Sequence, residues 1–156
     1  MNPKFDKHET FMSRCLKLAK RAETYGEVPI GALVVHNGEI IAQAYNKREK
    51  TFNATGHAEL LAIQSACKKL GSWRLSSCDL YVSLEPCLMC AGALVQSRIR
   101  AVYFGAFDPK GGALGSLYEI HKDSRLNHRF SVHGGILEKE CGHILREFFK
   151  KKRRKD

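Results

Sequence analysis

Cys87 and Cys90 are the residues whose spacing most directly suggests chemistry. They lie three positions apart in the segment PCLMC, after an apolar segment, residues 80–84, that predicts a buried strand. Pro86 suits a first helical turn, where no backbone N–H is needed, so we expect a helix to begin here. On a helix this spacing places both sulfurs on one face, and the N-terminal dipole favours their thiolate forms. Because thiolates bind metal ions, the segment predicts two metal ligands.

A third ligand is expected from His57, which opens the apolar segment HAELLAIQSACKKL. Structural zinc normally has four protein ligands, whereas catalytic zinc keeps one position for water, so one histidine and two cysteines favour a catalytic site. Residues i and i+2 diverge on a helix. His57 must therefore lie at or before the helix start if His57 and Glu59 are to reach one metal ion.

The combination of the two motifs is more specific than either motif alone. A lone CxxC pair is ambiguous, because a redox pair or two buried thiols have the same spacing. H-x-E followed by P-C-x-x-C is the signature of zinc-dependent nucleobase deaminases. In that chemistry zinc lowers the pKa of water to about 7, which makes hydroxide available to attack the base. Glu59 would carry the proton from that water to a ring nitrogen.

Hydrophobic periodicity predicts the elements that must position these residues. Residues 7–25 repeat apolar side chains at helical spacing, and residues 30–36 and 39–45 flank Asn37-Gly38, a strong hairpin signal. The helix from His57, the strand 80–84, the helix from Cys87 and the strand 101–105 then alternate, as parallel βαβ units do. We therefore expect an α/β fold, a three-layer α/β/α sandwich.

Length and composition predict one domain, residues 1–156. With 156 residues and 44% hydrophobic content the chain can bury a core, and its six cysteines are too sparse for a secreted disulfide scaffold. The N-terminal segment is polar and charged, and no run of 18 apolar residues occurs. We expect a cytoplasmic protein with no membrane contact. The single tryptophan, Trp73, is expected to pack.

The C-terminal part carries most of the positive charge. Residues 98–156 hold 14 basic and 7 acidic side chains, +7 of the net +10, and six of residues 150–156 are basic. A last helix, from about Glu138, would bury a stripe that Phe149 widens. Basic residues beside aromatic ones suit contact with a nucleic-acid backbone, although a solvated tail is the alternative. The glycine-rich segment 106–116 follows a strand, where α/β sheets place ligands, but an ordinary mobile connection would look the same.

Several segments of the chain resemble bacterial tRNA-specific adenosine deaminases, which convert the wobble adenosine of an anticodon to inosine. The resemblance covers nearly the whole chain. The H-x-E and P-C-x-x-C motifs are shared with cytidine, deoxycytidylate, guanine and riboflavin-pathway deaminases. Asn53-Ala54 and Gly56 stand where the family often has Asp-Pro and Ala. The LEPCLMCAGA segment and the DPKGGALGSL loop point more narrowly to the tRNA enzymes. The segments that carry the resemblance as a whole are VPIGALVV, AYNKR, GHAELLAI, LYVSLEPCLMCAGALVQSRI, FGAFDPKGGALGSL, LNHR and GGILEKEC.

The resemblance implies a cytidine-deaminase-like fold, with a mixed five-stranded central sheet, and a homodimer whose interface shapes the site. It also implies one Zn²⁺ per subunit, bound by His57, Cys87 and Cys90, with Glu59 as the proton shuttle. The implied substrate is the anticodon stem-loop of a tRNA. The remaining histidines have no ligand partner at recognisable spacing and are expected to be surface or core residues: His8, His36, His121, His128, His133 and His143.

Five further residues acquire roles in substrate binding from the resemblance. Asn46 would hydrogen-bond the flipped base, and the backbone of Ala58 would contact its reacting edge. Asp108 in the glycine-rich segment, with Phe149 and Arg153 in the last helix, match positions that face RNA in the family.

Two other functions remain as alternatives. A small-molecule deaminase acting on guanine or a pyrimidine would have the same zinc site, but it would not require the basic last helix or the glycine-rich segment. A non-catalytic zinc module that binds RNA would have no use for an unliganded carboxylate at Glu59.

Overall fold

The Asn37-Gly38 pair forms the turn of a β-hairpin, as its sequence predicts. The structure, a computed structural model, describes residues 6–155. Strands β1 (Gly31–His36) and β2 (Glu39–Tyr45) pair antiparallel on either side of this turn. The φ angles of Asn37 and Gly38 are 52° and 79°, the left-handed region that a type I′ turn requires.

Three more strands complete a single mixed sheet in the order β2–β1–β3–β4–β5. Strand β3 (Cys78–Leu84) pairs antiparallel with β1, whereas β4 (Ala101–Ala106) and β5 (Ser131–His133) continue the sheet in parallel. The five-stranded mixed sheet is therefore confirmed. The position of β5 was not predicted, because three residues are too few to show a period.

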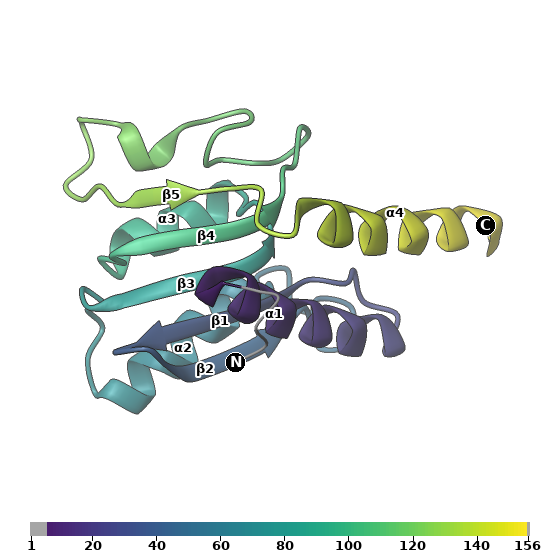
Figure 1. The fold of residues 1–156 in the computed structure, drawn as a ribbon, viewed down its shortest axis with the longest axis horizontal. Helices are drawn as coiled ribbons and strands as arrows, with labels where there is room; N and C mark the ends of the chain where they lie inside the picture. Colours follow the sequence, from purple (N-terminus) through teal and green to yellow (C-terminus); the bar gives the residue numbers. More distant parts are fainter. Residues whose placement is uncertain (1–5, 156) are drawn as a thin grey trace.

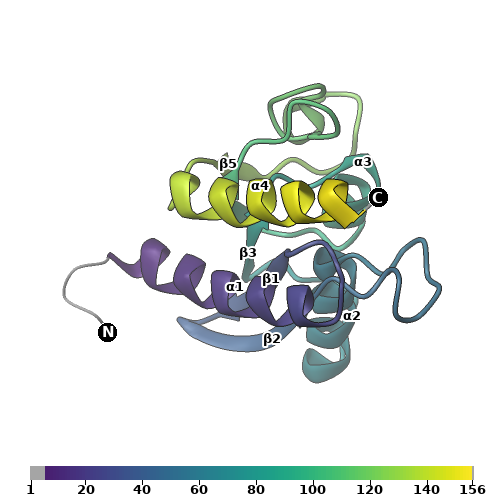
Figure 2. The same cartoon turned by 90° about the vertical axis from the view of Figure 1, so that its right-hand side faces the viewer.

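Four helices cover the two faces of the sheet (Figure 1). Helices α1 (Lys7–Thr24) and α4 (Glu138–Lys155) lie on one face. Helices α2 (Ala58–Leu70) and α3 (Leu88–Gln96) lie on the other, as the rotated view in Figure 2 also shows. The expected three-layer α/β/α sandwich is confirmed. Within residues 6–155, no helix combines the length and the apolar character needed to cross a membrane.

Each face of the sheet has its own hydrophobic core. The core under α2 and α3 includes Ala62, Leu94, Val34, Leu80 and Val82. The core under α1 and α4 includes Met12, Cys15, Leu33, Tyr81 and Cys141. Alternate residues of β1 and β3 thus point to opposite cores, which explains why these strands are mostly apolar on both faces.

Three predicted details differ from the structure. Pro86 lies before the N-cap of α3 rather than in its first turn, because Cys87 is still extended and the helix begins at Leu88. Phe149 does not widen the buried stripe of α4: it is 40% exposed, since it lies about 100° around the helix from the buried Phe148. Trp73 is 55% exposed, and it stacks with the guanidinium groups of Arg74 and Arg98 instead of packing in a core.

Residues 1–5 and 156 lie outside the described residues. They include the start of the polar N-terminal segment, the end of the basic tail, and both limits of the expected 1–156 domain. All six cysteines fall within the described part of the chain, where each is a free thiol.

The close packing of α1 on β1 requires glycine at position 31. A Cβ added to Gly31 would lie 2.2 Å from the carbonyl oxygen of Cys15 and 2.6 Å from Leu18 Cβ. We expect Gly31→Ala to lower the free energy of unfolding by about 1–3 kcal/mol through overpacking. Gly92 in α3 is the matched control, because among the described residues no atom outside its chain neighbours and the nearby backbone of α3 lies within 4 Å of its added Cβ. Gly92→Ala should instead raise stability by about 0.5–1 kcal/mol, as alanine favours helices.

Urea unfolding of both variants at equal metal content measures this difference. Equal effects of the two substitutions would contradict the packing of α1 on β1.

Candidate active site

Two helices lie on the same face of the sheet, and each begins at a different predicted metal ligand. His57 is the N-cap of α2 and Cys87 is the N-cap of α3, and both residues have extended backbone. Within residues 6–155, neither side chain makes a capping hydrogen bond to its own helix. The imidazole and the thiol are therefore free to face each other. His57 lies before the helix start, where it must lie if His57 and Glu59 are to reach the same metal ion.

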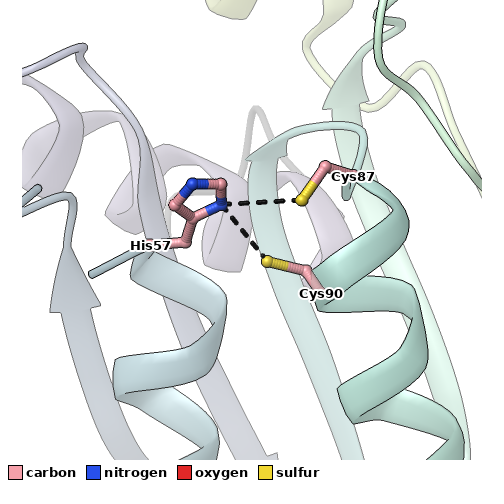
Figure 3. A group of neighbouring side chains, drawn as sticks. All are labelled: His57, Cys87 and Cys90. Atoms are coloured by element: carbon pink, nitrogen blue, oxygen red, sulfur yellow. Dashed lines mark hydrogen bonds between the residues drawn. The ribbon is translucent and has the colours of Figure 1, made fainter. Parts of the chain in front are cut away.

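The three predicted ligands converge (Figure 3). His57 Nδ1 lies 3.6 Å from Cys87 Sγ and 3.4 Å from Cys90 Sγ, and one ligand atom from each residue lies within 4.8 Å of the others. In a tetrahedral zinc site, bonds of about 2.0–2.1 Å to nitrogen and 2.3 Å to sulfur place these atoms about 3.6 Å apart. Both nitrogen–sulfur distances therefore match the spacing of such a site, and Nδ1 is the nitrogen that faces the sulfurs.

The two thiols differ in how readily they ionise. The side-chain hydrogen bond from Cys90 lowers the pKa of Cys87 to about 4, although burial opposes this shift. The same hydrogen bond, together with burial, raises the pKa of Cys90. The hydrogen bond with Cys87 raises the pKa of His57. The Cys87 thiol is thus the more easily ionised of the two, and its hydrogen bond to the imidazole favours the positively charged form of His57.

Glu59 is a buried carboxyl group in the first turn of α2. Its side chain is only 4% exposed, and this burial raises its pKa to about 7. A carboxyl group with this pKa can both accept and release a proton near neutral pH. A raised pKa beside candidate metal ligands marks Glu59 as a candidate acid–base residue.

Asn46 lies beside the segment that leads to His57. Lys47 N donates to the Gly56 carbonyl at 2.9 Å, so the residue after Asn46 is tied to the residue before His57. Asn46 is 4% exposed, and among the described residues its Oδ1 finds no hydrogen-bond donor. Leaving a buried amide oxygen unpaired costs free energy, which makes Asn46 a candidate for binding a substrate. Ala58 is the first residue of α2, where a backbone N–H has no acceptor within the helix.

The structure brings the three expected RNA-facing residues to one groove. Asp108, Phe149 and Arg153 line a groove of about 830 Å³ between the segment after β4 and helix α4. Asp108 Oδ1 also accepts hydrogen bonds from the backbone N–H groups of two residues that follow it, which closes a turn. Four other residues of the groove are basic or aromatic: Phe107, Lys110, Arg146 and Lys150. The first, second and fourth lie in the two segments that the sequence favours for ligand or nucleic-acid contact, whereas Arg146 was not predicted.

Two buried glutamates were also missed. Glu27 is completely buried and accepts hydrogen bonds from the backbone N–H groups of Glu49 and Lys50, at 3.0 and 2.7 Å. It thereby holds the segment between Asn46 and α2. Glu85 is buried next to the cysteine motif. The sequence feature that could have revealed it is an acidic residue at the end of an apolar strand, between Leu84 and Pro86.

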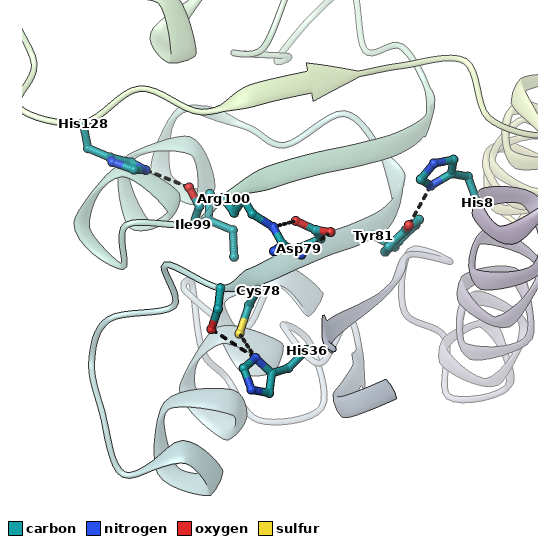
Figure 4. Close-up of polar contacts among 9 residues, drawn as sticks. His8, His36, Cys78, Asp79, Tyr81, Ile99, Arg100 and His128 are labelled. Carbon is teal, nitrogen blue, oxygen red and sulfur yellow. Dashed lines mark hydrogen bonds and ion pairs between the residues drawn. The ribbon is translucent and has the colours of Figure 1, made fainter. Parts of the chain in front are cut away.

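Other histidines make hydrogen bonds within the fold, away from the three ligands (Figure 4). His8 Nδ1 lies 2.7 Å from the Tyr81 hydroxyl, and the ring of His36 lies 3.7 Å from Cys78 Sγ. His128 Nε2 lies 2.7 Å from the Ile99 carbonyl. Within residues 6–155, the only group of three or more histidine, cysteine or acidic residues that could hold a metal ion is His57, Cys87 and Cys90.

Known proteins with similar sequences and structures are deaminases. The family model of MafB19-like deaminases matches residues 5–153. A tRNA-specific adenosine deaminase of Bacillus subtilis (strain 168) is 54% identical over 147 residues, which cover 94% of this chain and 91% of that protein. A solved structure from work on A-to-I editing by tRNA:A34 deaminases at the wobble position has a TM-score of 0.84 and 43% identity. The match covers 87% of this chain and 99% of that chain.

A solved guanine deaminase from Nitrosomonas europaea is a more distant neighbour. Its TM-score is 0.78 at 26% identity, over 90% of this chain and 83% of that chain. The sequence match to the tRNA enzyme is thus much closer, although the fold is shared. The chain therefore belongs to the MafB19-like deaminase family and, within it, to the tRNA-specific adenosine deaminases.

Proposed function

We propose that this protein deaminates adenosine to inosine at the wobble position of a tRNA anticodon, with one zinc ion per chain. The observation that carries the proposal is the convergence of His57, Cys87 and Cys90 at tetrahedral spacing, with buried Glu59 in the turn that follows His57. The close similarity to the tRNA-specific enzyme of Bacillus subtilis supports the choice of substrate.

The residues of the site have distinct tasks in this reaction. Zinc bound by His57 Nδ1 and the two sulfurs would supply Lewis-acid chemistry, since it lowers the pKa of water to about 7. Glu59 accepts a proton from the attacking water and delivers it to N1 of adenine. It then transfers the second proton of that water to the departing amine as the C6–N bond breaks, so that water and adenosine give inosine and ammonia. Asn46 hydrogen-bonds the base, and the N–H of Ala58 contacts its reacting edge.

The groove beside α4 is the proposed binding surface for the anticodon loop. Phe149 is exposed there and can stack on an unpaired base, while Arg153 lies four residues along the same helix and can reach phosphate. Asp108 lies on the opposite wall. Bases of an anticodon loop are already largely unstacked, so extruding the target costs less than the few kcal/mol estimated for a duplex.

The alternatives explain fewer of these features. A guanine deaminase would share the fold and the metal ligands, but a free base does not need a groove lined by Phe149 and Arg153. A non-catalytic zinc module would not need Glu59, whose burial raises its pKa. From the family resemblance we further propose that the protein is a homodimer. From length, composition and the polar N-terminal segment we propose that residues 1–156 form one domain and that the protein acts in the cytoplasm.

A competition between substrates tests the proposed function. Purified protein is offered an anticodon stem-loop with a wobble adenosine, alongside free adenosine, cytidine and guanine. We expect inosine in the stem-loop and no deaminated free base or nucleoside. Xanthine produced from guanine, with the stem-loop unchanged, would favour the guanine deaminase instead.

We expect about one zinc ion per chain and its loss in Cys87→Ala, because only two ligands would remain. Cys67→Ala is the matched control, since Cys67 is a free thiol in α2 outside the site. Metal analysis of both purified variants makes the comparison. Full zinc content in Cys87→Ala would refute the ligand assignment, as would zinc loss in a folded Cys67→Ala protein.

Glu59→Gln should retain zinc and fold but lose about 10²–10⁴-fold in turnover, because glutamine cannot carry the proton. Glutamine has nearly the same shape, so the affinity for RNA should change little. Single-turnover deamination and zinc content are measured together. Near-normal turnover would exclude Glu59 as the proton carrier, whereas loss of zinc would make it a ligand or a support for one.

Arg153→Ala should weaken stem-loop binding and lower the log–log salt slope by about 0.7, the value for one lost phosphate contact on a single strand. Arg154→Ala is the matched control, because Arg154 has the same charge but lies about 100° farther around α4. Binding is measured at several salt concentrations. Equal effects of the two substitutions would indicate a diffuse basic tail rather than contact in the groove.

A further inference from the structure

Glu85 is a buried carboxylate bound by the glycine-rich segment. Its side chain is only 2% exposed. Its Oε1 accepts hydrogen bonds from Asp108 N at 3.0 Å and from the Ser116 hydroxyl at 2.5 Å. Its Oε2 accepts from Leu114 N at 3.1 Å and from Ser116 N at 3.0 Å. Both oxygens therefore act only as acceptors.

The partners of Glu85 in residues 6–155 are backbone N–H groups and one hydroxyl, and none of these donors is a charged side chain. Burial of a carboxylate costs several kcal/mol unless hydrogen bonds or an opposite charge compensate for it. The loop supplies this compensation. Conversely, the carboxylate fixes the loop at three separate positions, from Asp108 to Ser116. The segment 107–116 is thus a clamped loop rather than a loose connection.

Gly112 lets the loop wrap closely around this carboxylate. A Cβ added to Gly112 would lie 2.2 Å from Glu85 Cδ and 2.3–2.4 Å from its two oxygens. Any side chain there would have to displace the carboxylate. The glycine-rich composition of the loop is therefore explained, at this position, by close approach to Glu85.

The same loop is attached to the turn that carries a metal ligand. Ala113 N donates to the Pro86 carbonyl at 2.9 Å, and Gly112 and Cys87 form an isolated antiparallel bridge. At its other end, the loop contributes Asp108 to the groove beside α4. Glu85 thus connects one wall of the groove to the backbone of Cys87.

We propose that Glu85 is a positioning residue for RNA recognition. It holds the 107–116 loop at a fixed place relative to Cys87, so that nucleotides bound in the groove present the target base to the reacting centre. This role rests on the function proposed above and adds a residue that touches neither the metal nor the base.

Glu85→Gln is the most informative variant. Glutamine keeps the shape but places an NH₂ donor against groups that themselves donate. The hydrogen bonds to at least one of the two side-chain oxygens of Glu85 are therefore lost. We expect the KM for the stem-loop to rise about 10-fold to 100-fold, as loss of hydrogen bonds to a charged group implies, with kcat changed less than about threefold. Zinc content should remain at one per chain.

Hydrogen exchange provides a readout that does not depend on activity. In Glu85→Gln, the amide protons of Asp108, Leu114 and Ser116 should exchange at least about tenfold faster, while those in β4 keep their protection. Ser116→Ala, which removes one of the four hydrogen bonds, should shift KM and exchange in the same direction by a smaller factor. If Glu85→Gln does not fold, the Ser116→Ala variant tests the positioning role in its place.

Leu33→Ala is the control for a general loss of stability. Leu33 is fully buried under α1, so this variant should lower the melting temperature without changing KM or loop exchange. Unchanged KM and unchanged exchange in Glu85→Gln would overturn the proposal. A fall in kcat at constant KM would also overturn it, because Glu85 would then act on chemistry. Zinc loss would make it a support for Cys87 instead.

The outcomes separate this inference from the proposed function. A wild-type protein that leaves the stem-loop unchanged would contradict the proposed function. Loop exchange and stem-loop binding affinity would still test Glu85 in that case, because neither measurement requires turnover. Equal affinity of the wild type and Glu85→Gln for the stem-loop would then overturn the positioning role.

Discussion

The candidate active site depends on two helices that begin next to each other, because their N-cap residues are two of the three candidate metal ligands. His57 and Cys87 keep extended backbone, and the Nδ1 of His57 lies 3.4–3.6 Å from the two sulfurs. Helices α2 and α3 lie on the same face of the sheet and share one core, which fixes their starting points. Both N-termini contribute partial positive charge, which favours a thiolate at Cys87.

Three buried glutamates show how environment decides the role of one residue type. Burial removes Glu59 from water without enough hydrogen bonds to offset the loss, and this raises its pKa to about 7. Glu27 and Glu85 are equally buried, but each accepts backbone hydrogen bonds from a neighbouring loop. Glu59 is therefore suited to carry a proton, whereas Glu27 and Glu85 are suited to hold loops in place.

The parallel pairing of β3 and β4 explains why the groove lies near the metal ligands. Leu84 and Ala106 are paired at the ends of these strands, so the segments that follow leave the sheet at the same edge. The segment after β3 carries Glu85 and Cys87, and the segment after β4 carries Asp108. This arrangement places the candidate site at the carboxyl ends of adjacent parallel strands, where α/β sheets commonly bind ligands. Helix α4 then supplies the opposite wall.

The sequence by itself determined most of the helices and strands, the candidate metal ligands and the family. The hairpin turn, the strands and the helices follow from local turn chemistry and from periods of 2 and 3.6 residues, and the pairs His57–Glu59 and Cys87–Cys90 are visible as motifs. Only the tertiary structure decided that Nδ1 faces the sulfurs, that Trp73 and Phe149 are exposed, and that Glu85 binds a loop more than 20 residues away along the chain. The reason is physical: periodicity reports which face of an element is buried, whereas the partner of a buried polar group is set by segments distant in sequence.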